Sequence, residues 1–161
     1  MRLSFHLFIH FFMCLIIGFL GSVILSIPFL YSFIASLIGG FLIDLDHLID
    51  YFLAFGFQHK LNYFLKGYQF LKSDKSYVLF HSFELSIFLI LLAFILHYYL
   101  LLIIATSLFL HLITDLSINK LSLKFYFLIY RLINNFDLKF IDTADAYKTH
   151  RRQKKKTSMD H

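Results

Sequence analysis

The sequence predicts an all-α integral membrane protein: a four-helix transmembrane bundle plus a C-terminal amphipathic helix on the membrane surface. Hydrophobic residues make up 59% of the 161 residues and the mean hydropathy is +0.72, more than an ordinary soluble domain carries. The apolar residues also gather in segments that suit spans of about 20 residues each. We expect a transmembrane domain over 1–118, an interfacial segment over 119–147 and a disordered basic tail over 148–161.

The first span is expected from Leu3 to Ile27, about 25 residues with no signal-peptide cleavage site. Pro28, the only proline, ends it. A second apolar segment starts at Phe29 and is long enough to span only if it continues toward Phe52. Its Gly39-Gly40 pair permits close helix packing or a kink.

The rest of the chain divides into a loop, two further spans and a surface helix. Residues 58–77 are polar and are expected to form a loop. The apolar stretch from 78 to 117 has twice the length of one span, so two helices are predicted, with a break at residues 97–99. Beyond Lys120, apolar residues at helical spacing alternate with Lys124, Arg131 and two asparagines, which predicts an amphipathic surface helix.

Charge sets the expected orientation. Residues 1–119 hold five Lys/Arg against six Asp/Glu, whereas residues 120–161 hold ten against four. A basic end of this kind can bind nucleic acid, but attraction to anionic lipid headgroups is the simpler explanation in a membrane protein. We therefore expect membrane lipid and no nucleic acid as partner, and an inner (cytoplasmic) membrane location with both termini cytoplasmic.

Histidines and acidic residues occur near one end of each predicted span, and this topology places all of these ends on the cytoplasmic side. A charge in the middle of a span costs roughly 2.5 to 3.5 kcal/mol, so acids gathered at one level suggest a shared task. His97, at the opposite end, is expected to be interfacial. The candidate metal ligands are His6, His10, Asp44, Asp46, His47, His81, His111 and Asp115.

Spacing supports some of these ligands better than others. His111 and Asp115 are four residues apart and share a helical face. Asp44 and Asp46 would point about 200° apart on a straight α-helix, so either the helix unwinds there or one Asp acts elsewhere. Asp50 is expected at a solvated helix end, and Ser82 as a helix cap rather than a nucleophile.

The donor types indicate the metal and its chemistry. Imidazole and carboxylate ligands favour zinc, with manganese or iron as alternatives, and Cys14 is the only cysteine. Four carboxylates, counting Glu84, would match two divalent ions, although one ion remains possible. A bound ion can activate water and polarise an ester. Glu84 is the candidate general base, and Asp46 is a second catalytic candidate.

Three motifs resemble the YdjM-like family of predicted membrane-bound metal-dependent hydrolases, which is distantly similar to zinc-dependent phospholipase C. They are residues 42–47 (Leu-Ile-Asp-Leu-Asp-His), 80–82 (Phe-His-Ser) and 111–115 (His-Leu-Ile-Thr-Asp), preceded by an N-terminal histidine. The resemblance covers roughly residues 6–115. It implies metal ligands at His6 or His10, Asp44, Asp46 or His47, His81, His111 and Asp115.

The sequence thus favours a membrane-embedded hydrolase acting on a lipid-borne ester, with a phosphoester as first choice. The alternative is a non-enzymatic protein that binds or transports metal, because His and Asp within spans also mark ion pathways. A transporter needs polar groups along its whole path, and the outer halves of these spans offer little beyond Ser22, Ser26 and His97. A third possibility is an inactive protein held together by its metal.

Overall fold

The computed structural model describes residues 3–57, 73–119 and 122–157. Every regular element in these ranges is a helix, and they contain one isolated β-bridge, between Lys75 and Asp137. The predicted all-α class is confirmed. Contacts divide the chain into two compact units, residues 1–44 with 82–118 and residues 45–81 with 119–161. The expected transmembrane domain over 1–118 therefore does not match the division by contacts, since 45–81 group with the C-terminal part.

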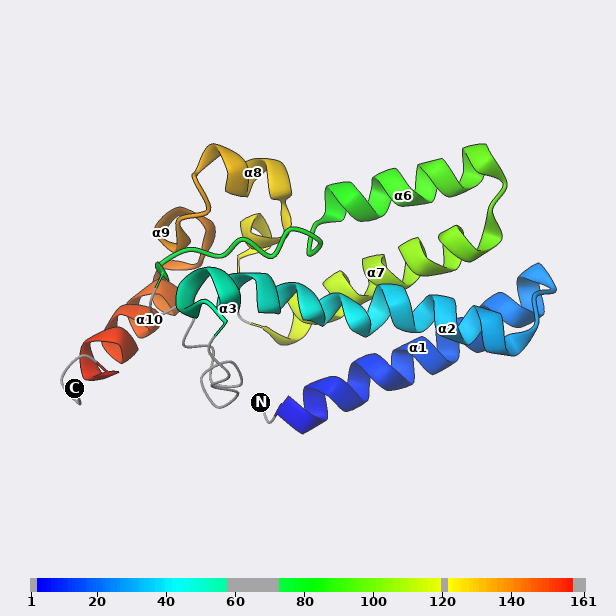
Figure 1. Cartoon of the computed structure of the whole chain (residues 1–161), viewed down its shortest axis with the longest axis horizontal. Helices are drawn as coiled ribbons and strands as arrows, with labels where there is room; N and C mark the ends of the chain where they lie inside the picture. Colours follow the sequence, from blue (N-terminus) through cyan, green and yellow to red (C-terminus); the bar gives the residue numbers. More distant parts are fainter. Residues whose placement is uncertain (1–2, 58–72, 120–121, 158–161) are drawn as a thin grey trace. The chain divides into compact units, whose positions relative to one another are not determined.

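The first unit consists of four apolar helices (Figure 1). These are α1 (Leu3–Leu25), α2 (Phe29–Gly40), α6 (Phe83–Leu96) and α7 (Tyr99–Ile118). Helices α1, α2 and α7 contact one another, and α6 packs against α7. Short connections join α1 to α2 and α6 to α7. The first contains Ser26 at φ 53° and Pro28, and the second contains His97 at φ 52°.

Large apolar side chains cover the outside of this unit, and helix α2 turns only small side chains toward the inside. The buried residues of α2 are all small: Ser32, Ala35, Ser36, Gly39 and Gly40. A Cβ atom on Gly39 would overlap the carbonyl oxygen of Ile104 in α7, so the two backbones approach closely because this position has no side chain. Small residues between helices and exposed aromatic residues such as Phe8 and Phe19 are typical of helix packing in lipid.

Three helical stretches are long and apolar enough to cross a membrane, namely Phe5–Leu25, Phe29–Phe55 and Tyr99–Ile118. The second begins with α2 and continues through the two helices that follow it in the chain. The remaining predicted span is shorter than expected. It was expected from residue 78, but α6 starts at Phe83 and has 14 residues, a length of about 21 Å at 1.5 Å per residue. A hydrocarbon core is about 30 Å thick. The fourth transmembrane crossing therefore stays a prediction.

The second unit is built from short helices. The 3₁₀ helix η1 (Leu42–Asp46) leads into α3 (His47–Phe55), and η2 (Leu123–Tyr126), α8 (Leu128–Ile133) and α9 (Leu138–Ile141) follow later in the chain. The prediction of one amphipathic surface helix beyond Lys120 is wrong. Asn135 and Phe136 take positive φ values of 51° and 59°, which an α-helix cannot accommodate.

The basic C-terminal segment is helical, contrary to the predicted disorder from residue 148. It forms α10 (Ala144–Thr157), in which His150 and Lys154 lie one turn apart and both contact the carboxylate of Asp74. These contacts hold the helix to the segment at residues 73–78. Residues 158–161 of the predicted tail and residues 58–72 of the predicted polar loop lie outside the described ranges.

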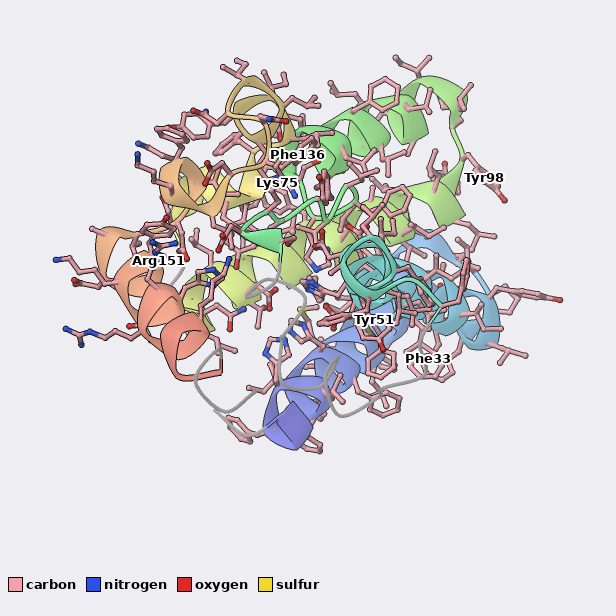
Figure 2. The ribbon with its side chains drawn as sticks, turned by 60° about the vertical axis from the view of Figure 1, so that its left-hand side comes forward. Phe33, Tyr51, Lys75, Tyr98, Phe136 and Arg151 are labelled. Carbon is pink, nitrogen blue, oxygen red and sulfur yellow. The ribbon has the colours of Figure 1, made fainter. Side chains whose placement is uncertain are left out.

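The segment at residues 73–78 also contacts the turn before α9. Leu138 N donates to Asp74 O and Ser76 N donates to Phe136 O, both at 3.0 Å, and the rings of Tyr77 and Phe136 lie 4.9 Å apart. Figure 2 labels Lys75 and Phe136 at this junction. Segments far apart in the sequence are therefore joined here by main-chain hydrogen bonds.

Candidate metal centre

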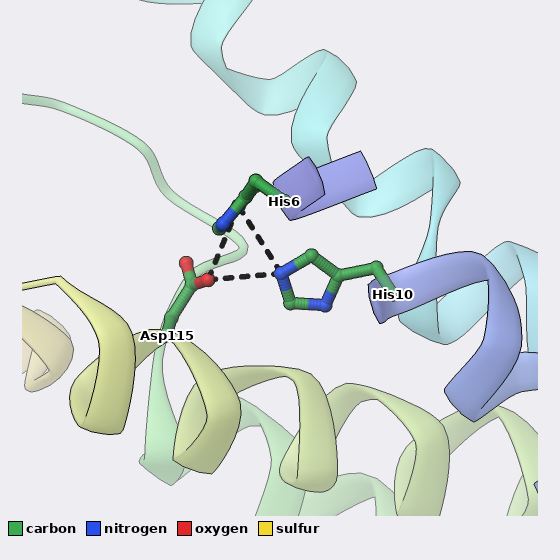
Figure 3. A group of neighbouring side chains, drawn as sticks. All are labelled: His6, His10 and Asp115. Atoms are coloured by element: carbon green, nitrogen blue, oxygen red, sulfur yellow. Dashed lines mark hydrogen bonds and ion pairs between the residues drawn. The ribbon is translucent and has the colours of Figure 1, made fainter. Parts of the chain in front are cut away.

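Three predicted ligands converge between α1 and α7 in the first unit (Figure 3). His6 and His10 lie one turn apart on α1, and their Nε2 atoms are 3.1 Å apart. The Oδ1 atom of Asp115 on α7 lies 3.1 Å from His10 Nε2 and 3.4 Å from His6 Nε2. One donor atom from each residue lies within 4.8 Å of the others, which is close enough to share one ion.

His111 and Asp44 extend this group. His111 lies one turn before Asp115 on α7, and its ring stacks on the His10 ring with centroids 4.0 Å apart. Its Nε2 atom is 3.4 Å from Asp44 Oδ1 and 3.6 Å from Asp115 Oδ2. Five of the eight predicted ligands are thus connected through contacts within one unit. We call His6, His10, Asp44, His111 and Asp115 the five-residue cluster.

The orientation of His111 is set by the backbone. Its Nδ1 atom lies 3.0 Å from the carbonyl oxygen of Gly40 and donates a hydrogen bond to it, which leaves Nε2 directed at the two carboxylates. A Cβ on Gly40 would lie 2.7 Å from the sulfur of Cys14, so glycine permits the packing beside this carbonyl. Fixing one imidazole nitrogen through a carbonyl is how proteins orient histidine ligands for a metal.

The five-residue cluster is largely buried. His10 and His111 have no exposed surface and Asp115 is 5% exposed, whereas the His6 side chain retains 17% exposure. In the described part of the chain His10 Nδ1 has no hydrogen-bond partner. The cluster is therefore partly open at His6 and at Asp44, whose side chain is 23% exposed.

The remaining predicted histidine ligands lie in the second unit, around Asp46. Asp46 Oδ2 accepts hydrogen bonds from the main-chain nitrogens of Phe80 (2.6 Å) and His81 (3.3 Å), and His81 Nδ1 lies 3.3 Å from the same atom. The rings of His47 and His81 are 4.9 Å apart. In this unit Asp46 orients His81, and its predicted catalytic role stays a prediction.

The spacing problem of Asp44 and Asp46 is resolved by the second predicted alternative, in which one Asp acts elsewhere. The chain does not unwind but tightens into the 3₁₀ helix η1 at these residues, and successive side chains turn by about 120°. Asp44 contacts His111 of the first unit, whereas Asp46 contacts the segment at residues 80–81 of the second. The two carboxylates thus serve different partners.

The sequence did not predict the burial of two charged residues in the second unit. Asp50, expected at a solvated helix end, is 2% exposed and accepts hydrogen bonds from the main-chain nitrogens of Tyr77 (2.7 Å) and Val78 (3.4 Å). Arg131, expected on a polar face, is fully buried and donates to the carbonyl oxygens of Tyr77, Val78 and His81 at 2.7 to 2.9 Å. We call Asp50 and Arg131 the backbone clamp.

Three other predicted roles can be placed. Ser82 caps α6 by accepting a hydrogen bond from Leu85 N at 3.2 Å, as expected. Glu84, the predicted general base, lies in the first turn of α6 and is partly exposed. His97 is exposed and ends α6 at the opposite end from Ser82.

The grouping of histidines and acidic residues at the span ends predicted the residues of the five-residue cluster, whereas no pattern predicted the backbone clamp. A lone Arg131 between apolar neighbours is compatible with either a surface or a buried position. Comparison with protein-family models, with curated proteins and with solved structures finds no match for this chain.

Proposed function

We propose that this chain is a membrane-embedded, metal-dependent hydrolase that acts on a lipid-borne ester at the cytoplasmic face, with a phosphoester as first candidate. One observation carries the proposal: His6, His10 and Asp115 come from two apolar helices and bring their donor atoms within 4.8 Å of one another. Imidazole and carboxylate donors suit zinc, manganese and iron(II). Resemblance to the YdjM-like hydrolases points in the same direction.

The position of the five-residue cluster supports a lipid substrate. His6 lies three residues after the start of α1 at Leu3, and Asp115 lies three residues before the end of α7 at Ile118. At 1.5 Å per residue these positions are about 5 Å from the helix ends. Headgroups meet acyl chains at such a level, and the partly exposed His6 leaves access on that side.

The chain's own groups would divide the work. The five-residue cluster would hold the ion, and the Glu84 carboxylate would accept a proton from the attacking water. A divalent ion in this position would supply a Lewis acid and lower the pKa of bound water to about 7.

Transport of the ion is the second candidate, and one observation favours it. Ser32 and Ser107 are fully buried in the first unit, and neither hydroxyl has a hydrogen-bond partner among the described residues. Such hydroxyls could continue a polar path beyond the five-residue cluster. Ser36, also buried, already donates to Cys14 O at 2.7 Å, and hydroxyls alone are weak ligands for a divalent ion. Hydrolysis is therefore the better-supported function.

The test uses the full chain, purified in detergent and loaded with zinc or manganese. We expect hydrolysis of at least one phospholipid or isoprenoid phosphate in mixed micelles, loss of activity with a chelator, and recovery with one divalent metal. Glu84→Gln should keep its metal and lose most turnover, while His97→Ala should keep both. If the loaded protein hydrolyses no phosphoester or carboxylester in a broad lipid panel but moves the ion across proteoliposomes, transport replaces hydrolysis.

A further inference from the structure

Asp115 presents its two carboxylate oxygens to different donors. Oδ1 lies within 3.4 Å of the Nε2 atoms of His6 and His10, and Oδ2 lies 3.6 Å from His111 Nε2. His111 Nε2 is also 3.4 Å from Asp44 Oδ1. The five-residue cluster thus contains two groups of donors, and Asp115 belongs to both.

Neutral imidazoles cannot satisfy all of these contacts with their protons. His111 donates its Nδ1 proton to Gly40 O, so in its neutral form Nε2 carries a lone pair that faces two carboxylate oxygens. His6 Nε2 and His10 Nε2 also face each other at 3.1 Å, where at most one can donate to the other. Lone pairs that face one another in a buried place are stabilised by positive charge between them, from a proton or from a metal ion. A metal ion in each group of donors would supply this charge through the same nitrogen and oxygen atoms.

The spacing of the two groups suits a pair of ions. The His10 and His111 rings come from different groups and stack with centroids 4.0 Å apart at an interplanar angle of 29°. Metal ions in two-metal hydrolytic sites lie about 3.5 to 4 Å apart. The stacked rings place the two groups of donors beside each other, as such a pair of ions requires.

We propose that the five-residue cluster binds two divalent cations bridged by the Asp115 carboxylate. The first ion takes His6, His10 and Asp115 Oδ1, and the second takes His111, Asp44 and Asp115 Oδ2. This inference rests on the proposed function for the presence of a metal, and it adds the number of ions and the role of each ligand. Two divalent ions carry four positive charges against two from Asp44 and Asp115, so the remaining positive charge favours an anionic group such as a phosphate diester.

The first experiment needs only the wild-type full chain. Metal is removed with a chelator in detergent, Mn²⁺ is added in excess and washed away, and bound metal is counted per chain by mass spectrometry. We expect two Mn²⁺ per chain, and a low-temperature electron paramagnetic resonance spectrum with the splitting of an exchange-coupled pair. One Mn²⁺ at saturation, or two with spectra of isolated ions, would overturn the bridge.

Variants then assign the ligands. His6→Ala and Asp44→Ala should each lower the count from two to one and abolish the coupling, whereas Asp115→Ala should lower it below one. His97→Ala is the matched control and should keep two coupled ions. Size-exclusion elution and circular dichroism identify variants that fail to fold, and the wild-type spectrum decides the matter without them. An exchange-coupled pair of ions that persists in Asp115→Ala would contradict the proposal.

Failure of this inference and failure of the proposed function give different results. Two coupled ions in a protein that hydrolyses no ester keep the bridge and refute the hydrolase. One ion with ester hydrolysis refutes the bridge and keeps the hydrolase.

Discussion

The five-residue cluster and the backbone clamp both bury charged or titratable side chains, but they differ in what those side chains face. Asp50 and Arg131 face main-chain nitrogens and carbonyl oxygens, so each hydrogen bond joins a charge to a group that would otherwise be unpaired. In the five-residue cluster the nitrogens and carboxylate oxygens face one another. Burial alone therefore does not identify a functional group. The nature of the partners separates a structural charge from a ligand.

The largest expected effect tests the backbone clamp. Arg131→Met removes a buried charge and leaves three carbonyl oxygens without their donor, so we expect the free energy of unfolding to fall by about 3 to 5 kcal/mol. Thermal and denaturant unfolding in detergent measure it. Arg152→Met on the exposed side of α10 is the control and should change it by less than about 0.5 kcal/mol. Equal effects from the two substitutions would mean that Arg131 is not structural.

The five-residue cluster should respond to metal instead. Zinc at about 100 times its dissociation constant should stabilise the wild type by about 2.7 kcal/mol, because it binds only the folded state. Asp115→Asn should lose most of this gain, and Arg152→Met should keep it. The measurement is the melting temperature with zinc and with a chelator. If the wild type melts at the same temperature with zinc and with a chelator, the five-residue cluster does not bind zinc and does not differ in this respect from the backbone clamp.

A smaller effect concerns the close approach of helices in the first unit. Gly39→Ala places a methyl group against the carbonyl of Ile104, and overpacking of this kind costs about 1 to 3 kcal/mol. Ile38→Ala changes an exposed residue one position earlier and serves as the matched control. Unfolding in detergent compares the two, and a larger loss in Ile38→Ala would show that Gly39 does not set the approach of α2 and α7.

The smallest effect is expected at Asp74, outside the predicted spans. Burial would raise the pKa of this carboxyl, but hydrogen bonds from Lys154 and His150 outweigh it and lower the pKa below 3.8. The contact therefore stabilises α10 fully above about pH 4 and is lost as the pH falls through the lowered value. Asp74 is partly exposed, so we expect only about 0.2 to 1 kcal/mol.

Hydrogen exchange of the α10 amides measures this contact. Asp74→Asn should exchange these amides faster than the wild type at the same neutral pH. Asp145→Asn in the first turn of the same helix is a control, because Asp145 is exposed. Slower exchange in Asp74→Asn than in the wild type would contradict the assignment.

Local patterns predicted what depends on neighbours in sequence. The first span was expected over Leu3–Ile27 and α1 covers Leu3–Leu25, because apolar length is readable from residues alone. His111 and Asp115 were paired correctly, since four residues place them on one face of α7. Spacing within a helix carries this information without any knowledge of the fold.

Contacts between distant residues could not be predicted in this way. Arg131 donates to carbonyls about 50 residues earlier, and Asp50 accepts from nitrogens 27 and 28 residues later. No periodicity relates such positions. The late start of α6 at Phe83 has the same origin, because the segment before it is apolar yet its main-chain groups bind Asp46, Asp50 and Arg131 instead of forming a helix.

The length of α6 has a consequence for the surrounding bilayer. A helix of 14 residues falls short of the hydrocarbon thickness by about 9 Å, and a short hydrophobic element is accommodated by local thinning of the bilayer. If α6 crosses the bilayer as predicted, headgroups beside it would be drawn inward along the first unit. For the proposed hydrolase, this thinning would bring a phospholipid ester toward the imidazoles while the lipid stays in its leaflet.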